Sequence, residues 1–232
     1  MVRSILHEQL LESDRNSVLD GWRLNELRPR LEAFISNDVD RIMASVQHVE
    51  KKFVHGDFSK RAIFYYLHHN PPVNSPTTTA PNNILFDPTS RRITAIIDFD
   101  WARIGCIADE CLLSFDGRYA QLPSPKEIDP DRIALRTALL HGFPSPLPPS
   151  SKTVEWDMAA LWDAQLEEHG VIRACTIEGI EKMSWLYSFR DTMIPNTLSW
   201  DVIVKQRTAE DLEREKLATS QTLLEYITSP IV

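Results

Sequence analysis

The interpretation of this chain depends on two segments, Phe53-Val54-His55-Gly56-Asp57-Phe58-Ser59 and Pro81-Asn82-Asn83-Ile84-Leu85-Phe86. Residues 60–80 separate them, and without these 21 residues the segments join as HGDFS-PNNILF. Asp57 and Asn83 are 26 positions apart, and leaving out the 21 residues reduces this spacing to 5. A short apolar strand followed by an Asp, and five positions later by an Asn, is the spacing of a catalytic loop that transfers phosphoryl groups.

Phosphoryl transfer needs a carboxylate that orients the attacking hydroxyl, and hard oxygen ligands for magnesium. We expect Asp57 to be this catalytic base. Asn83 and Asp98 are the predicted magnesium ligands, because Asp98 follows directly on the β-rich run from 93 to 97. Residues 87–90 are typical of a hairpin turn, which would fold the chain back so that both ligands face one site.

The sequence resembles the aminoglycoside phosphotransferase and choline kinase family, whose members have the protein-kinase-like fold, and within it a fungal branch. The resemblance covers roughly residues 25–228 without the insertion and corresponds to the C-terminal lobe alone. It implies ATP and Mg²⁺ as cofactors, Asp57 as the base, Asn83 and Asp98 as metal ligands, and His55 as a support of the loop. The matching stretches are residues 53–58, 82–87, 97–102 and 108–110.

Three further carboxylates follow the predicted metal ligand, namely Asp100, Asp109 and Glu110. They are candidates for contact with a cationic small-molecule substrate; helix capping or a position on the surface is the interpretation that we favour. The net charge of −8 suits a cationic substrate, but an acidic surface that keeps the protein in solution is the explanation that we favour. Aminoglycosides, choline-like amines, sugars and amino-alcohols all remain open as acceptors.

Two departures from the family pattern affect activity. No G-x-G-x-x-G or P-loop motif occurs, and Lys51 and Lys52 are the only lysines before Asp57, so we expect the N-terminal β lobe to be absent. Residues 60–80 are an insertion that we expect to be disordered, and a retained intron is a hypothesis for its origin. ATP affinity is therefore expected to be weak, and the enzyme impaired or inactive in this form.

Two other functions stay open beside the phosphotransferase. The first is a catalytically silent kinase-like module that binds a ligand or a protein partner. The second, which is weaker, is a metal hydrolase that uses His55, Asp57, Asp98 and Asp100. The hydrolase lacks a second, well-spaced histidine such as that of H-E-x-x-H.

The expected fold class is α+β and mostly helical, a single domain over residues 1–232 with a small β-hairpin at the catalytic loop. Apolar residues recur at three- and four-residue steps through the first 50 residues, which predicts helices there. Short strands are expected at 52–58, 84–86 and 93–97. Further helices are expected at 131–141, 154–169, 177–193 and 209–227.

Composition excludes several classes of protein. No apolar run approaches the roughly 20 residues that span a bilayer, so no membrane partner is expected. The negative net charge argues against a nucleic-acid partner, because phosphate backbones require clustered Lys and Arg. The three cysteines form no C-x-x-C pair, which predicts buried, reduced thiols and a cytoplasmic protein.

Overall fold

The computed structural model describes residues 2–15, 26–47, 50–56, 84–87, 89–100, 102–114 and 117–228. The chain forms two compact units. Unit 1 combines the two ends of the sequence, residues 1–46 and 181–232, and unit 2 is residues 47–180. The predicted insertion at 60–80 lies outside the described residues, and the expectation of a single domain stays a prediction.

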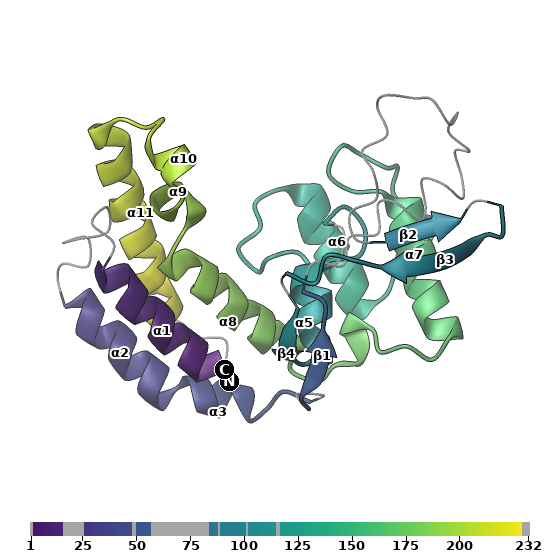
Figure 1. The fold of residues 1–232 in the computed structure, drawn as a ribbon, viewed down its shortest axis with the longest axis horizontal. Helices are drawn as coiled ribbons and strands as arrows, with labels where there is room; N and C mark the ends of the chain where they lie inside the picture. The colour runs from purple at the N-terminus through teal and green to yellow at the C-terminus, as the bar shows by residue number, and fades with distance from the viewer. Residues whose placement is uncertain are drawn as a thin grey trace. The chain divides into compact units, whose positions relative to one another are not determined.

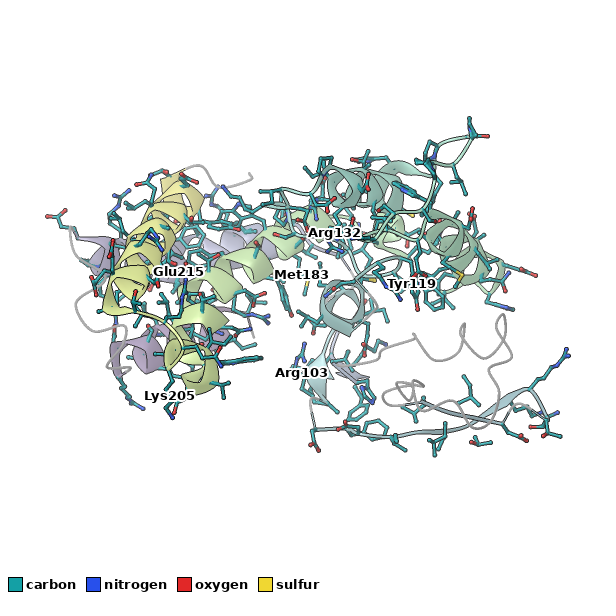
Figure 2. All side chains as sticks on the ribbon, turned by 90° about the horizontal axis from the view of Figure 1, so that it is seen from above. Arg103, Tyr119, Arg132, Met183, Lys205 and Glu215 are labelled. Atoms are coloured by element: carbon teal, nitrogen blue, oxygen red, sulfur yellow. The ribbon has the colours of Figure 1, made fainter. Side chains whose placement is uncertain are left out.

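Unit 1 is helical in its described residues (Figure 1). Its amphipathic helices form because their apolar residues recur on one face; in α2 the buried positions are 27, 31, 34 and 35. Glu215 of α11, labelled in Figure 2, accepts a hydrogen bond of 2.9 Å from the hydroxyl of Thr197 in α9. The helices are α1 (Val2–Arg15), α2 (Leu27–Asn37), α3 (Val39–Met43), α8 (Ile180–Met193), α9 (Asn196–Ser199), α10 (Asp201–Val204) and α11 (Ala209–Thr228).

The core of unit 1 is built around aromatic rings from three helices. Phe189 of α8 is completely buried, and its ring centroid lies 5.1 Å from that of Phe34 in α2 and 5.7 Å from that of Tyr226 in α11. Trp185 stacks on Phe189 at 6.1 Å, one helical turn away. Such edge-to-face and offset-stacked pairs add to the free energy gained by burying the rings. This cluster therefore joins the N-terminal helices to the C-terminal ones.

The described residues of unit 2 form two small antiparallel sheets, each with two strands (Figure 1). The first pairs β1 (Lys52–Val54) with β4 (Arg103–Gly105), so that Phe53 lies opposite Ile104. The second is the predicted hairpin of β2 (Ile84–Asp87) and β3 (Arg92–Ile96). Sequence analysis missed β4, because three residues ending in Gly105 are too short to show an alternating pattern.

Among the helices of unit 2, α6 and α7 match the predicted ranges, whereas the shorter α5, η1 and η2 were not predicted. At the start of α6, Oδ1 of Asp129 accepts hydrogen bonds from the backbone N–H groups of Asp131 (2.9 Å) and Arg132 (3.3 Å). This N-cap, with Pro130 at the first helical position, explains where the helix begins. The elements are α5 (Ile107–Asp109), the π-helical turn η1 (Glu110–Ser114), α6 (Pro130–His141), α7 (Trp156–Glu168) and the short 3₁₀ turn η2 (Ala174–Thr176).

The described residues confirm the coarse fold class, α+β and mostly helical. Cys106 and Cys111 are buried as predicted, whereas the prediction was wrong for Cys175, which is exposed. Within the described part of the chain, no helix combines the length and the apolar character needed to cross a bilayer.

Candidate functional site

The site is organised around His55, which follows β1 and is 7% exposed. Its backbone N–H donates a hydrogen bond of 2.6 Å to Oε1 of Glu110. Its ring Nε2 lies 3.0 Å from the carbonyl oxygen of Ile97. A carbonyl only accepts, so this contact requires the proton on Nε2. His55 therefore links the end of β1 to the start of η1 and to the segment after β3.

Two features shape the chain around His55. Gly56 has a φ of 79°, in the left-handed region that glycine enters without steric cost, so the chain turns as it leaves β1. The ring of Phe99 lies 4.8 Å from the His55 ring and 6.0 Å from that of Phe53. Phe99 therefore packs against the imidazole and joins it to the aromatic side chain of β1.

Asp98 follows β3 by two residues and has a φ of 61°. This left-handed conformation is uncommon for a residue other than glycine, although Asp and Asn adopt it more readily than others. Its side chain is exposed, as is that of Asp100. Backbone conformations of this kind concentrate at functional sites, where the surrounding structure maintains them.

Asp109 is completely buried, and its Oδ2 accepts a hydrogen bond of 2.8 Å from the backbone N–H of Cys106. This is the helix-capping role, the alternative to substrate contact that the sequence left open. Gly105 makes the approach possible, because a Cβ there would lie 2.1 Å from Asp109 Oδ2 and 2.7 Å from Val54 Cγ2. Burial raises the pKa of the Cys106 thiol, and the neighbouring Asp109 carboxylate raises it further.

Glu110 begins the π-helical turn η1, and turns of this type often occur at functional sites. Its Oε1 accepts the His55 N–H, while its Oε2 is buried and has no hydrogen-bond partner within the described residues. The carboxylate therefore points toward the loop that follows β1. Glu110 was a candidate for contact with a substrate. Its contact with the backbone of His55 was not predicted, because the sequence offers no signal for it.

The predicted site residues thus divide into four groups, one of which is the buried Asp109 that caps α5. Asp57 and Asn83 lie outside the described residues. His55 and Glu110 are brought together, whereas Asp98 and Asp100 are exposed after β3. Among the residues that the structure describes, no group of three or more His, Cys, Asp or Glu side chains is placed to hold a metal ion.

Comparison of the chain with family models, with curated proteins and with solved structures found no match. The interpretation of function therefore rests on the residues of this chain and their contacts.

Proposed function

We propose that this chain is an ATP-dependent phosphotransferase of the kinase-like type, acting on a small-molecule alcohol or amine. Asp57 would accept the proton of the attacking group. Asn83 and Asp98 would hold the magnesium ion that accompanies ATP, since amide and carboxylate oxygens are the ligands this ion prefers. The bond from the γ-phosphorus to the bridging oxygen breaks, a bond to the acceptor forms, and ADP leaves.

One observation carries this proposal: the chain segments adjoining the three proposed residues meet at Ile96 and Ile97. Ile84, the residue after Asn83, is the antiparallel partner of Ile96, so the two strand ends adjoin. The ring of His55, two residues before Asp57, contacts the carbonyl of Ile97, the residue before Asp98. Asn83, Asp98 and Asp57 each lie within two residues of a residue that makes one of these contacts. This closeness supports their convergence on one cation.

The backbone of Asp98 and the anchoring of His55 support the proposal further. The left-handed conformation at Asp98 exposes a carboxylate at the end of a strand. His55 is held through its ring and through its backbone N–H, so the loop that begins at Gly56 leaves a fixed point. A catalytic loop needs a fixed starting position, because a misplacement of the reacting groups by about 1 Å lowers the rate about 100-fold.

Asp100 is the remaining exposed carboxylate beside this site, and it suits a cationic acceptor. The buried Asp109 and the loop-directed Glu110 are committed to backbone contacts. We therefore propose Asp100 as the substrate contact among the three carboxylates. A positively charged amino-alcohol or aminoglycoside fits this arrangement better than a neutral sugar.

A direct test measures transfer of radiolabelled γ-phosphate from ATP, with Mg²⁺, to a panel of aminoglycosides, choline-like amines and amino-alcohols. We expect one class to be labelled, and we expect Asp57→Asn to abolish labelling while the circular dichroism spectrum is unchanged. Asp98→Asn should lose labelling and also lose the thermal stabilisation by MgATP, because Asn tolerates the left-handed backbone but removes the charge. Full turnover by Asp57→Asn would contradict the assignment of the base.

Asp100→Asn is the matched control for Asp98→Asn, since both remove one exposed carboxylate from the same segment. It should leave MgATP stabilisation unchanged and weaken only the cationic acceptor. If the wild-type chain labels no acceptor and millimolar MgATP gives no thermal shift, the silent binding module is the correct alternative. The insertion at residues 60–80, which falls between Asp57 and Asn83, is the observation that favours that alternative.

A further inference from the structure

Three exposed apolar side chains gather on the outer face of the β1–β4 sheet. Phe53 of β1 is the antiparallel partner of Ile104 in β4, so both side chains lie on this face, whereas Val54 is buried on the other. The ring of Phe99 lies 6.0 Å from that of Phe53 and extends the same surface. Phe53 is 65% exposed, Ile104 is 56% exposed and Phe99 is 47% exposed. We call Phe53, Phe99 and Ile104 the aromatic platform.

The size of the aromatic platform indicates what kind of molecule covers it. Its side chains expose roughly 300 Å² together, since a large apolar side chain has about 150–250 Å² of surface. Apolar patches of this size on monomeric proteins are often functional. A stable protein interface, by comparison, buries about 800 Å² on each partner. The platform is therefore too small for a stable protein partner and matches one aryl or branched-alkyl group.

An exposed carboxylate adjoins the aromatic platform. Asp100 follows Phe99 directly, so their Cα atoms are about 3.8 Å apart. The backbone N–H of Ala102 donates a hydrogen bond of 2.9 Å to the carbonyl of Phe99, which makes Asp100 the first residue inside a tight turn. Its side chain is exposed at this turn. A carboxylate beside an apolar surface is complementary to a ligand that is both cationic and apolar.

We propose that the acceptor is an amphiphilic amino-alcohol, whose ammonium group contacts Asp100 and whose aryl or branched-alkyl arm covers the aromatic platform. This inference rests on the proposed phosphoryl transfer and narrows its acceptor. The acceptor hydroxyl loses its proton to Asp57 and forms the bond to the γ-phosphorus, while ADP leaves. The ring of His55, two residues before Asp57, lies 4.8 Å from that of Phe99 and connects the platform to this loop. Aminoglycosides and sugars have no such arm.

Calorimetric binding of three probes, measured without ATP, tests the proposal. Phenylalaninol has the hydroxyl, the ammonium group and a phenyl arm. Alaninol lacks the phenyl ring, and the third probe is the neutral diol in which a hydroxyl replaces the amine of phenylalaninol. Phenylalaninol should bind about tenfold more tightly than alaninol, because its ring is buried, and about threefold more tightly than the diol. Equal affinity for phenylalaninol and alaninol, or no binding of either, would overturn the proposal.

Variants of the site separate the contribution of the arm from that of the charge. Phe53→Ala should raise the dissociation constant of phenylalaninol about tenfold and leave that of alaninol unchanged. Asp100→Asn should weaken both amines about threefold and leave the diol unchanged. Ile104→Ala, a smaller truncation on the same face, should weaken phenylalaninol about threefold and replaces Phe53→Ala if that variant does not fold. Trp200→Ala removes an exposed aromatic side chain of unit 1 and is the control, which should bind as the wild type does.

The same probes distinguish this proposal from the proposed function. If phenylalaninol binds as expected but receives no label from ATP with Mg²⁺, the phosphoryl transfer is wrong and the site for an amphiphilic amine is supported. If another acceptor is labelled while phenylalaninol and alaninol bind equally, the transfer stands and the proposal is overturned. A dimer in sedimentation velocity that Phe53→Ala disperses would show that a second copy covers the platform, which also overturns the proposal.

Discussion

The helical core of unit 1 and the β2–β3 hairpin of unit 2 both contain large apolar side chains, but these side chains differ in how far they are buried. In unit 1, Phe34 of α2, Phe189 of α8 and Tyr226 of α11 are buried, and Phe189 is entirely so. In the hairpin, Leu85, Ile93 and Ile96 remain substantially exposed. A helix presents its apolar residues as one stripe that neighbouring helices cover, whereas a two-stranded hairpin exposes both faces unless a further layer is added.

The residues that stabilise the fold most and the residues proposed for phosphoryl transfer therefore lie in different parts of the chain. The large buried aromatic cluster belongs to unit 1, and the residues proposed for phosphoryl transfer adjoin the small sheets of unit 2. Regions with few buried apolar contacts open at low free-energy cost. We therefore expect hydrogen exchange to be slow in α8 and fast in β3. Four substitutions test this contrast, from the largest expected effect to the smallest.

Phe189→Ala should have the largest effect. It removes a buried ring that contacts Phe34, Trp185 and Tyr226, and such truncations cost about 3–5 kcal/mol. Ile93→Ala in the hairpin should cost less than about 1 kcal/mol, because its side chain is already half exposed. Urea denaturation followed by far-ultraviolet circular dichroism measures both. Equal losses for the two variants would contradict the contrast between the regions.

Gly105→Ala should be the most damaging small change in unit 2. The added Cβ would meet the buried Asp109 carboxylate and Val54, so either the cap or the β1–β4 pairing must shift, at a cost of about 1–3 kcal/mol. Gly170→Ala is the control, because no atom lies within 4 Å of its Cβ and only the left-handed backbone is strained. That strain is worth about 1 kcal/mol. Thermal unfolding of the two variants distinguishes a steric effect from a backbone effect.

Glu110→Ala removes the acceptor of the His55 N–H. Hydrogen bonds to charged groups contribute about 1.5–3 kcal/mol, so the loop after β1 should open more often. Glu110→Gln keeps an oxygen acceptor without the charge and should lose less. Hydrogen exchange at the amide of His55 reports this opening directly. If exchange there is unchanged in Glu110→Ala, the carboxylate does not anchor the loop.

Of the substitutions at buried positions, Tyr226→Phe should have the smallest effect at neutral pH. It removes the hydrogen bond of 2.6 Å to Ser188 Oγ, worth about 1 kcal/mol. Burial raises the pKa of Tyr226 above its ordinary value of 10.0. The folded chain therefore keeps its phenolic proton where the unfolded chain loses it, and stability falls as pH rises above about 10.

The pH dependence provides a second measurement for the same variant. Because phenylalanine has no ionisable group, Tyr226→Phe should lose less stability than the wild type between neutral pH and about pH 11. Denaturation midpoints at several pH values measure the difference. Parallel curves for the two proteins would show that Tyr226 is not the group whose ionisation weakens unit 1.

Much of the fold was predictable because periodicity is local. The apolar spacing predicted helices within the first 50 residues, ranges close to those of α6, α7, α8 and α11 were predicted, and the turn after Asp87 predicted the hairpin. Asp87 holds that turn through hydrogen bonds from the N–H groups of Thr89 (2.9 Å) and Ser90 (3.2 Å). β4 was not predictable, because a three-residue strand depends on its partner β1, about 50 positions earlier in the sequence.

For the candidate site, the contacts of the described residues were predictable only in part: support of the loop was expected of His55 and helix capping was favoured for Asp109, whereas the contact of Glu110 with the His55 backbone was not predicted. His55, Asp98 and Glu110 were selected by their order and spacing, which a motif preserves. Whether a carboxylate faces substrate, caps a helix or accepts a backbone N–H depends on the direction in which the chain turns, as Asp109 and Glu110 show. The two adjacent acids contact different backbone groups because η1 begins between them.

Unit 1 contains the first and the last helices of the described chain, and this arrangement has a consequence for biosynthesis. On the ribosome, residues 47–180 are synthesised before α11, so unit 2 can begin to fold while unit 1 still lacks Tyr226 of its aromatic cluster. The apolar faces of α1 and α2 therefore stay uncovered until the C-terminal helices have been synthesised. Translation speed and chaperone supply should therefore govern the yield of this protein more than the packing of its small sheets does.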